Sequence, residues 1–534
     1  MRRNSGKKYV CTADLNSAPS FVYTQLEHTQ KGIKNMLKVK NYQFWFCTGS
    51  QDLYGDECLS HVAAHSKEIV EKLNASGNLP YEVVWKPTLI TNELIRKTMN
   101  EANMDDNCAG IITWMHTFSP AKSWILGLQE LRKPLLHLHT QYNREIPYDT
   151  IDMDFMNENQ AAHGDREYGH IFSRLHMERK VIMGYWEDKA TQDRIGSWMR
   201  TAVGVLESSH IRVMRIADNM RNVAVTEGDK VEAQIKFGWE VDAYPVNEIA
   251  ESVAAVSESD TNALVDEYYE KYDILLEGRD PEEFRRHVAV QAQIELGFER
   301  FLDEKNYQAI VTHFGDLGAL KQLPGLAIQR LMGKGYGFGA EGDWKVAAMT
   351  AIMKSMGDNG NGCSLFMEDY TYNLVPGAEY SLGAHMLEVC PCCAAEKPRI
   401  ETHPLGIGMN EKDPARLVFE GKAGPAIVVS LIDMGGRLRL ICQDIECVKP
   451  ILPMPNLPVA RVMWKALPSL ATGVECWITA GGAHHTVLSY DVTAEQMHDW
   501  ANMMDIEFVH IGKDTTPESL EHDLFLADLA WKLK

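Results

Sequence analysis

The N-terminal half of the chain alternates short apolar runs with stretches of helical periodicity, and this alternation restricts the possible folds more than any other feature. Apolar runs at 42–49, 108–115 and 133–141 have the length and composition of buried strands. Stretches at 59–76 and 116–131 have the apolar spacing of helices. Because alternating strands and helices form parallel sheets covered on both faces, we expect a doubly wound α/β domain.

Several residues directly follow or end these apolar runs. They are Gln51, Asp52 and Leu53 after the first run, His116 after the second, and His139 within the third. In doubly wound sheets, ligands bind at the loops beyond the carboxyl ends of the strands. We therefore expect these five residues to lie at a ligand-binding edge.

A second set of apolar runs continues the pattern. Runs at 210–220 and 307–317 have the composition of strands, and 323–335 has the spacing of a helix that ends at glycine. We therefore expect an N-terminal α/β domain over 36–210 and a second doubly wound domain over 211–360.

The remainder of the chain, 361–534, has short apolar runs separated by glycine and proline. Alternation at 437–445 and 474–480 predicts antiparallel strands, so we expect a β-rich, barrel-like C-terminal domain with one or two final helices. Residues 1–35 have a basic start but no continuous apolar segment. That composition predicts a disordered N-terminal extension and argues against a secretory signal.

Length and charge exclude several classes of protein. The chain has 534 residues, a net charge of −21 and no apolar run that approaches a membrane span. Nucleic acids and anionic membranes select basic surfaces, so we expect neither as a partner. Eleven irregularly spaced cysteines suit reduced thiols, which favours a soluble, cytoplasmic protein that acts on small molecules.

One group of cysteines resembles half of a zinc site. Cys390, Cys392 and Cys393 are clustered, and Cys442 and Cys447 follow about fifty residues later. Two ligand pairs of a zinc site usually lie closer together in sequence. Structural or incidental thiols are therefore the favoured interpretation.

A glycine-rich run at 333–343 suggests a nicotinamide-dependent dehydrogenase as an alternative. Gly335, Gly337 and Gly339 have spacings found in dinucleotide-binding loops. Such a loop lies between a strand and a helix, whereas this run follows a helical segment. A close backbone approach that positions Glu341 and Asp343 is the better interpretation.

Four possible metal ligands are distributed through the C-terminal part of the chain: Glu341, Glu368, His385 and His485. Two carboxylates and two imidazoles suit a divalent ion such as Mn²⁺ and can leave positions open to a substrate. Glu368 lies among aromatic residues, which is a setting typical of a functional or paired acid. A lone histidine in the setting of His385 is more often a satisfied core residue than a ligand, and the spacing alone leaves convergence of the four residues open.

The sequence resembles the L-arabinose isomerase family from about residue 40 to nearly the C-terminus. The resemblance is carried, in order, by TGSQDLYG, MHTFSPAK, HTQYN, IDMDFMNENQAAHGDREYG, DNMRNVAVTEGDKVEAQIKFG, LKQLPGLAIQRLM, GYGFGAEGDWK, FMEDYTY, HMLEVCP, LGIG, DPARLVFEGK and AGGAHHT. Members of this family interconvert L-arabinose and L-ribulose, commonly accept D-galactose and typically use Mn²⁺. The resemblance therefore implies an aldose-ketose isomerase of arabinose catabolism.

The family pattern assigns roles to individual residues. It implies one Mn²⁺ per subunit, or another divalent ion, held by Glu341, Glu368, His385 and His485, with His485 rather than His484 as ligand. It also implies a hexamer in which one subunit completes the active site of its neighbour. The substrate-facing residues would be Gln51, Leu53 and His139 from the neighbour, together with Phe314 and His484.

Two residues depart from the family pattern. Gly315 lies where an acid commonly follows the phenylalanine, and Gly318 replaces a bulkier residue. All four expected metal ligands are present, but these two glycines can alter the substrate preference and the rigidity of the loop relative to other members of the family.

The implied reaction requires a proton to leave C2 of the sugar and a proton to reach C1. We expect Glu341 and Glu368 to act as base and acid on an enediol path, with Asp343 supporting the metal ligands. Which glutamate removes the proton is open, and a hydride shift would use the same ligands. A sugar-binding regulatory protein of doubly wound fold remains an alternative, since it needs the loops but not the four ligands.

Overall fold

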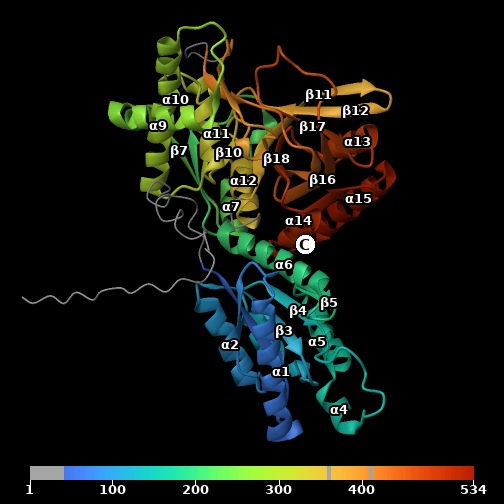
Figure 1. The fold of residues 1–534 in the computed structure, drawn as a ribbon. Helices are drawn as coiled ribbons and strands as arrows, with labels where there is room; N and C mark the ends of the chain where they lie inside the picture. The colour runs from blue at the N-terminus through green and yellow to red at the C-terminus, as the bar shows by residue number, and fades with distance from the viewer. Residues whose placement is uncertain (1–40, 358–361, 408–412, 534) are drawn as a thin grey trace, which may run out of the picture.

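The computed structural model describes residues 41–357, 362–407 and 413–533. Figure 1 shows an N-terminal unit, coloured blue to cyan, below a larger body formed by the rest of the chain. Helix α6 (Lys189–Ser208) lies between the two. The extension expected over residues 1–35 falls outside the described residues.

The N-terminal unit is a parallel five-stranded sheet with the strand order β2-β1-β3-β4-β5. Its strands are β1 (Gln43–Gly49), β2 (Glu82–Trp85), β3 (Cys108–Met115), β4 (Leu135–His139) and β5 (Lys180–Met183). Its helices are α1 (Gly55–Ala75), α2 (Asn92–Met104), α3 (Ile125–Glu130), α4 (Met153–Glu158), α5 (Ala161–Leu175) and α6. One apolar core joins the sheet to α1 and α6, and another joins it to α2, α3 and α5. The predicted doubly wound sheet is therefore confirmed.

The helix predicted over 116–131 begins later than expected. Residues 116–120 are an extended loop, followed by the 3₁₀ helix η2 (Ala121–Trp124) and then by α3. Pro120 disfavours helical backbone at Ser119 before it, which delays the helix. The delay leaves His116 in the loop after β3.

The central region contains a second parallel sheet with the strand order β10-β9-β6-β7. Its strands are β6 (Arg212–Ile216), β7 (Glu240–Tyr244), β9 (Ala309–Val311) and β10 (Gly337–Gly339). The helices are α7 (Lys230–Phe237), α8 (Val246–Ala254), α9 (Glu258–Lys271), α10 (Pro281–Lys305), α11 (Gly325–Gly333) and α12 (Trp344–Met356), with 3₁₀ turns η3 (Ala224–Thr226) and η4 (Phe314–Asp316). The expected α/β class of this region is confirmed.

The glycine-rich run differs from the sequence-based expectation. Strand β10 lies inside it and helix α12 follows, so the run forms a strand–turn–helix rather than simply following a helix. Its glycines permit close packing, because a Cβ on Gly339 would lie 2.2 Å from the backbone oxygen of Asp343 and one on Gly342 would lie 2.4 Å from Cα of Asn219. The space that a side chain would need at these glycines is occupied by the protein's own backbone.

The C-terminal region is a closed barrel. Its strands pair in the ring β15-β18-β11-β12-β17-β16, which closes through β16 and β15, and β19 pairs with β16 outside the ring. These strands are β11 (Ser364–Val375), β12 (Ala378–Ala384), β15 (Gly424–Asp433), β16 (Leu438–Val448), β17 (Arg461–Ala466), β18 (His485–Ser489) and β19 (Glu507–Ile511). The predicted barrel-like architecture is therefore confirmed.

Three helices and a small sheet complete the C-terminal region. The helices are α13 (Leu470–Ala480), α14 (Ala494–Met503) and α15 (Pro517–Leu533), and η6 (Pro391–Cys393) is a short 3₁₀ turn. The small sheet contains β8 (Asp273–Ile274), β13 (Arg399–Thr402) and β14 (Ala415–Val418). None of the helices within the described ranges is long and apolar enough to cross a membrane.

The strand predicted at 474–480 is wrong, because this segment belongs to helix α13. Its buried residues include Leu470, Gly473, Trp477 and Ala480, which follow helical spacing rather than strict alternation. Ser469 caps the first turn by accepting a hydrogen bond from the Thr472 amide, and the helix ends at a glycine with positive φ. The N-terminal cap and the helical spacing of buried residues over the whole segment outweigh the alternation of apolar and polar residues within it.

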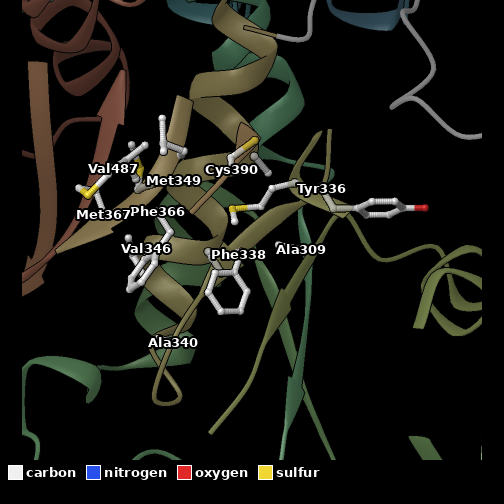
Figure 2. Close-up of a cluster of buried hydrophobic side chains, with 14 of the residues drawn as sticks. Ala309, Tyr336, Phe338, Ala340, Val346, Met349, Phe366, Met367, Cys390 and Val487 are labelled. Carbon is white, nitrogen blue, oxygen red and sulfur yellow. The ribbon is translucent and has the colours of Figure 1, made fainter. Parts of the chain in front are cut away.

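Helix α12 joins the central sheet to the barrel, and all of its residues are buried. Figure 2 shows Phe338 of β10, Val346 and Met349 of α12, Phe366 of β11 and Val487 of β18 in one apolar cluster. The central region and the barrel therefore share a continuous core, which fixes the ends of their strands relative to one another.

Candidate active site

Glu341 lies in the turn between β10 and α12. Its backbone has φ of 56°, a left-handed conformation that costs free energy for a residue other than glycine. The turn is held by hydrogen bonds from the Met220 amide to the Glu341 carbonyl (2.8 Å) and from the Gly342 amide to the Thr312 carbonyl (3.2 Å). The surrounding backbone therefore maintains a strained conformation that positions this carboxylate.

Strand pairing brings Glu368, His385 and His485 together. Glu368 on β11 is paired with His485 at the start of β18, and on its other side with Ala384 at the end of β12. His385 directly follows Ala384. Residues from three segments of the chain therefore meet because of the antiparallel register of the barrel.

The four residues converge through their side-chain tips. Nε2 of His485 lies 3.3 Å from Oε1 of Glu368 and 3.6 Å from Oε2 of Glu341, and Nε2 of His385 lies 3.5 Å from Oε1 of Glu368. The His485 side chain is fully buried, and its Nε2 has no hydrogen-bond partner. A buried, unpartnered imidazole nitrogen facing two carboxylates fits the donor set of a divalent cation.

The other nitrogen of each imidazole contacts a further carboxylate. Nδ1 of His485 lies 3.1 Å from Oδ2 of Asp343, and Nδ1 of His385 lies 2.6 Å from Oε2 of Glu388. These contacts fix the orientation of both rings, as is typical of metal-binding histidines. Sequence reasoning identified Asp343 but missed Glu388. Its position three residues after His385 was the available signal.

Charge pairing outweighs burial in this cluster. Burial disfavours the charged forms, but Lys345 and His485 lower the pKa of Asp343 to about 2. Burial also opposes a charge on His485, yet its hydrogen bond to Asp343 and the nearby carboxylates of the two glutamates raise its pKa well above the ordinary value. For Glu368, neighbouring histidines outweigh burial and lower the pKa. The lowered pKa values keep the carboxylates of Asp343 and Glu368 ionised, so they attract cations.

His484 lies beside the converging residues and has a different environment. It is exposed, and one of its ring nitrogens lies within 4.8 Å of ligand atoms of Glu341 and His485. It also lines a cavity of about 190 Å³ with Trp464, Trp477 and other residues of the barrel. Partial desolvation by the surrounding protein and the adjacent His485 lower the pKa of His484, so the ring favours its neutral form. A neutral, accessible imidazole at this position is suited to hydrogen bonding with a bound molecule.

Phe314 lies in the loop that follows β9, and this loop is hydrogen-bonded to the turn that carries Glu341. It begins η4, two residues after Thr312, whose carbonyl accepts the hydrogen bond from Gly342. Its side chain is half-buried against the central core. Gly315 and Gly318 follow in the same loop, and a Cβ on Gly315 would lie 3.1 Å from Nε2 of His313.

Gln51, Leu53 and His139 lie at the carboxyl edge of the N-terminal sheet, away from the four converging residues. Helix α12 begins beside this cluster, whereas its last residue, Met356, contacts Gly204 on α6. Its 13 residues span about 20 Å. Figure 1 shows the N-terminal unit beyond α6, at the opposite end of the molecule from β11.

A buried carboxylate that the sequence analysis did not identify orients His139. Asp165 on α5 bonds Nδ1 of His139 and also Nε2 of His137, the latter at 2.7 Å. The hydrogen bond with Asp165 raises the pKa of His139. Alternate residues of a strand share one face, so the sequence HLH on β4 was the available signal.

The cysteine interpretation is supported by the positions of the thiols. In the described parts of the chain, the groups of side chains close enough to hold a metal contain no cysteine. Cys442 and Cys447 lie buried on β16, and Cys390 lies 4.0 Å from the buried ammonium group of Lys354.

Models of three domains match successive parts of the chain. The N-terminal domain of L-arabinose isomerase matches residues 38–210, the central domain matches 212–359 and the C-terminal domain matches 363–507.

Several full-length relatives are also similar. L-arabinose isomerase of Halalkalibacterium halodurans is 57% identical over 480 residues, which is 90% of this chain and 96% of the relative. That of Geobacillus thermodenitrificans is 56% identical over 93% of this chain and 100% of the relative. That of Bacillus subtilis is 53% identical over the same shares. The predicted resemblance is confirmed: the chain is an enzyme of the L-arabinose isomerase family.

Proposed function

We propose that the enzyme converts L-arabinose to L-ribulose, and D-galactose to D-tagatose, at one Mn²⁺ held by Glu341, Glu368, His385 and His485. The observation that carries this proposal is the buried Nε2 of His485, which faces both carboxylates without a hydrogen-bond partner. When bound, a divalent cation polarises the substrate oxygens and stabilises the negative charge that develops on them.

Glu341 and Glu368 carry the proton transfer. One carboxylate oxygen accepts the proton as the C2–H bond breaks, a carboxyl group returns a proton to C1, and the hydroxyl proton of O2 passes to O1 as the carbonyl moves to C2. The two glutamates differ in setting, because Glu341 is the more exposed and Glu368 lies beside two imidazoles. Asp343 and Glu388 keep the imidazoles in position, and His484 and Phe314 contact the sugar.

The glutamates are tested by Glu341→Gln and Glu368→Gln, with Glu446→Gln on the exposed side of β16 as the matched control. We expect both active-site variants to retain their circular dichroism and lose ketose formation from L-arabinose and D-galactose. They should also bind less Mn²⁺ by elemental analysis, whereas the control should match wild type. Near-normal turnover by either active-site variant would contradict its assignment.

An enediol path and a hydride shift predict different labelling. In deuterated water, proton transfer through a carboxyl group brings solvent deuterium to C1 of the ketose. A hydride shift retains the substrate's own hydrogen. Ketose without deuterium at C1, measured by NMR at early conversion, would exclude the proposed proton transfer.

Gln51, Leu53 and His139 of one subunit complete the active site of a neighbour in a hexamer. Two observations support this: the N-terminal unit that carries the three residues lies at the opposite end of the molecule from β11, which carries Glu368, and Leu53 is 82% exposed. The test mixes inactive His139→Ala chains with inactive Glu368→Gln chains after reversible dissociation. Sites shared between chains should regain activity in mixed oligomers, because some sites then receive both native residues. No recovery after verified mixing would contradict shared sites.

A further inference from the structure

A second group of possible metal ligands lies in the N-terminal unit, far from Glu368. His61 and His65 are four residues apart on α1, so both project from one face of the helix. His116 follows β3, and Glu158 ends α4. We propose that these residues form a structural site for a divalent transition metal such as Zn²⁺, separate from the active site.

The distances between ligand atoms fit such an ion. Nδ1 of His65 lies 2.8 Å from Nε2 of His116 and 3.4 Å from Oε1 of Glu158. Ligand atoms of these three residues all lie within 4.8 Å of one another, whereas His61 lies outside this group and comes near Glu158 alone, with Nδ1 3.3 Å from the other carboxylate oxygen. Ligands about 2.1 Å from a first-row metal lie roughly 3.0–3.4 Å apart in square-planar or tetrahedral geometry, so His65, His116 and Glu158 need only small adjustments.

Packing holds two of the imidazoles in place. The ring of His116 stacks on Trp114 with centroids 4.5 Å apart, and the ring of His65 stacks on Tyr142 at 3.6 Å. The His116 side chain is fully buried, whereas the His61 side chain is 53% exposed. The group therefore combines a fixed inner ligand with an outer side that is open to an entering ion.

The chemistry of the group favours a borderline cation over Ca²⁺ or Mg²⁺. Two imidazoles and one carboxylate, with the imidazole of His61 as the fourth ligand after rotation of its exposed side chain, match the ligands of Zn²⁺, whereas hard cations prefer oxygen. Burial lowers the pKa of His65, and burial lowers that of His116 to about 3, so both rings are neutral at physiological pH. Metal binding displaces the hydrogen that one ring shares with the other, and that ring changes tautomer so that both rings bind in their neutral form.

The site would join three elements at the edge that carries Gln51 and Leu53. Tyr54 follows Leu53 in η1 (Asp52–Tyr54), and its hydroxyl accepts a hydrogen bond from Gln160 at 3.2 Å. The backbone N–H of Gln160 in turn donates a hydrogen bond to the His116 carbonyl at 2.9 Å. An ion bound by α1, the loop after β3 and the end of α4 therefore holds this edge in one arrangement.

The test measures Zn²⁺ binding to the metal-stripped full-length protein in which Glu341→Gln and Glu368→Gln weaken the active-site ligands. We expect one Zn²⁺ per chain by calorimetry and elemental analysis. Adding His65→Gln or Glu158→Leu should remove that equivalent or weaken it at least tenfold, because even outer partners of metal ligands contribute 10–100-fold in affinity. His170→Gln on the exposed surface of α5 is the matched control and should leave binding unchanged.

Co²⁺ provides a second measurement at the same position. Absorption from nitrogen-coordinated Co²⁺ should persist in the Glu341→Gln, Glu368→Gln protein and disappear when His65→Gln is added. Circular dichroism and thermal unfolding of each variant verify folding. Equal Zn²⁺ stoichiometry and affinity with and without His65 would overturn the proposal. Because the measurements use metal content rather than turnover, their outcome is independent of the proposed isomerase mechanism.

Discussion

Asp343 contacts His485 across the boundary between the central sheet and the barrel, with Oδ2 of the carboxylate 3.1 Å from Nδ1 of the imidazole. The other oxygen, Oδ1, accepts hydrogen bonds from the Lys345 and Val346 amides and thereby caps α12. The same oxygen lies 3.1 Å from the buried ammonium group of Lys345. One carboxylate therefore begins a helix, neutralises a lysine and orients a proposed metal ligand.

Asp343→Asn should weaken Mn²⁺ binding by about 10–100-fold, because a neutral amide neither fixes the Nδ1–H of His485 nor raises the basicity of the ring as a ligand, as the carboxylate does. Asparagine caps helices as well as aspartate does, so loss of the cap is not the cause. Titration of the metal-stripped enzyme with Mn²⁺, followed by activity, measures the change. Asp280→Asn at the start of α10 alters a comparable cap away from the site and should leave affinity unchanged. Equal affinity in Asp343→Asn and wild type would contradict the positioning role.

Asp343 should also contribute to stability in a defined pH window. Its pKa falls from 3.8 in the unfolded chain to about 2, so the carboxylate stabilises the fold above pH 3.8 and ceases to do so as pH falls through 2. The linked free energy is about 2 kcal/mol. The stability difference between wild type and Asp343→Asn, measured by urea unfolding, should therefore shrink by about that amount between pH 5 and pH 2. A constant difference would contradict the lowered pKa.

Glu341→Gly should be more stable than Glu341→Ala by about 1 kcal/mol, although both should be inactive. The reason is the backbone φ of 56°, which glycine adopts without the steric cost that alanine retains. Both variants lack the carboxylate, so the difference in their stability reports the backbone conformation at this position. Thermal unfolding gives the difference. If alanine is equally stable, the turn carries no strain at this position.

Asp165→Asn should move the NMR titration midpoint of His139 downward, because the hydrogen bond with Asp165 raises that pKa. A raised histidine pKa adds stability below the unfolded value of about 6.5, and that stability is lost as pH rises through the folded value. The variant should therefore lose more stability at pH 5.5 than at pH 9. An unchanged midpoint for His139 would rule out the orienting role of Asp165.

Gly383→Ala should destabilise the barrel by about 1–3 kcal/mol, which is the usual cost of overpacking. A Cβ at this position on β12 would lie 2.0 Å from the Trp464 ring. Because His385 follows two residues later, Mn²⁺ affinity should fall as well. Gly406→Ala is the control, since nothing lies within 4 Å of its Cβ position. Unfolding and metal titration of the two variants provide the comparison, and equal behaviour would contradict tight packing at Gly383.

Local patterns were sufficient to predict the α/β order of the first two regions. The apolar run at 108–115 corresponds to β3, because a buried parallel strand needs a continuous apolar sequence. The segment at 474–480 shows the limit of this reasoning: its alternating residues form a helix because capping at Ser469 and burial along one helical face act over a longer stretch. Short apolar runs alone do not distinguish the two structures.

The sequence by itself determined which chemical groups were present: two glutamates, two histidines and a family pattern that contains them. Only the tertiary structure decided that they meet, because barrel register places Glu368 opposite His485 and a shared core brings the Glu341 turn beside them. It likewise decided that Glu388 and Asp165 support imidazoles, and that His65, His116 and Glu158 form a second cluster. These relationships depend on contacts between residues distant in the chain, which local propensity does not encode.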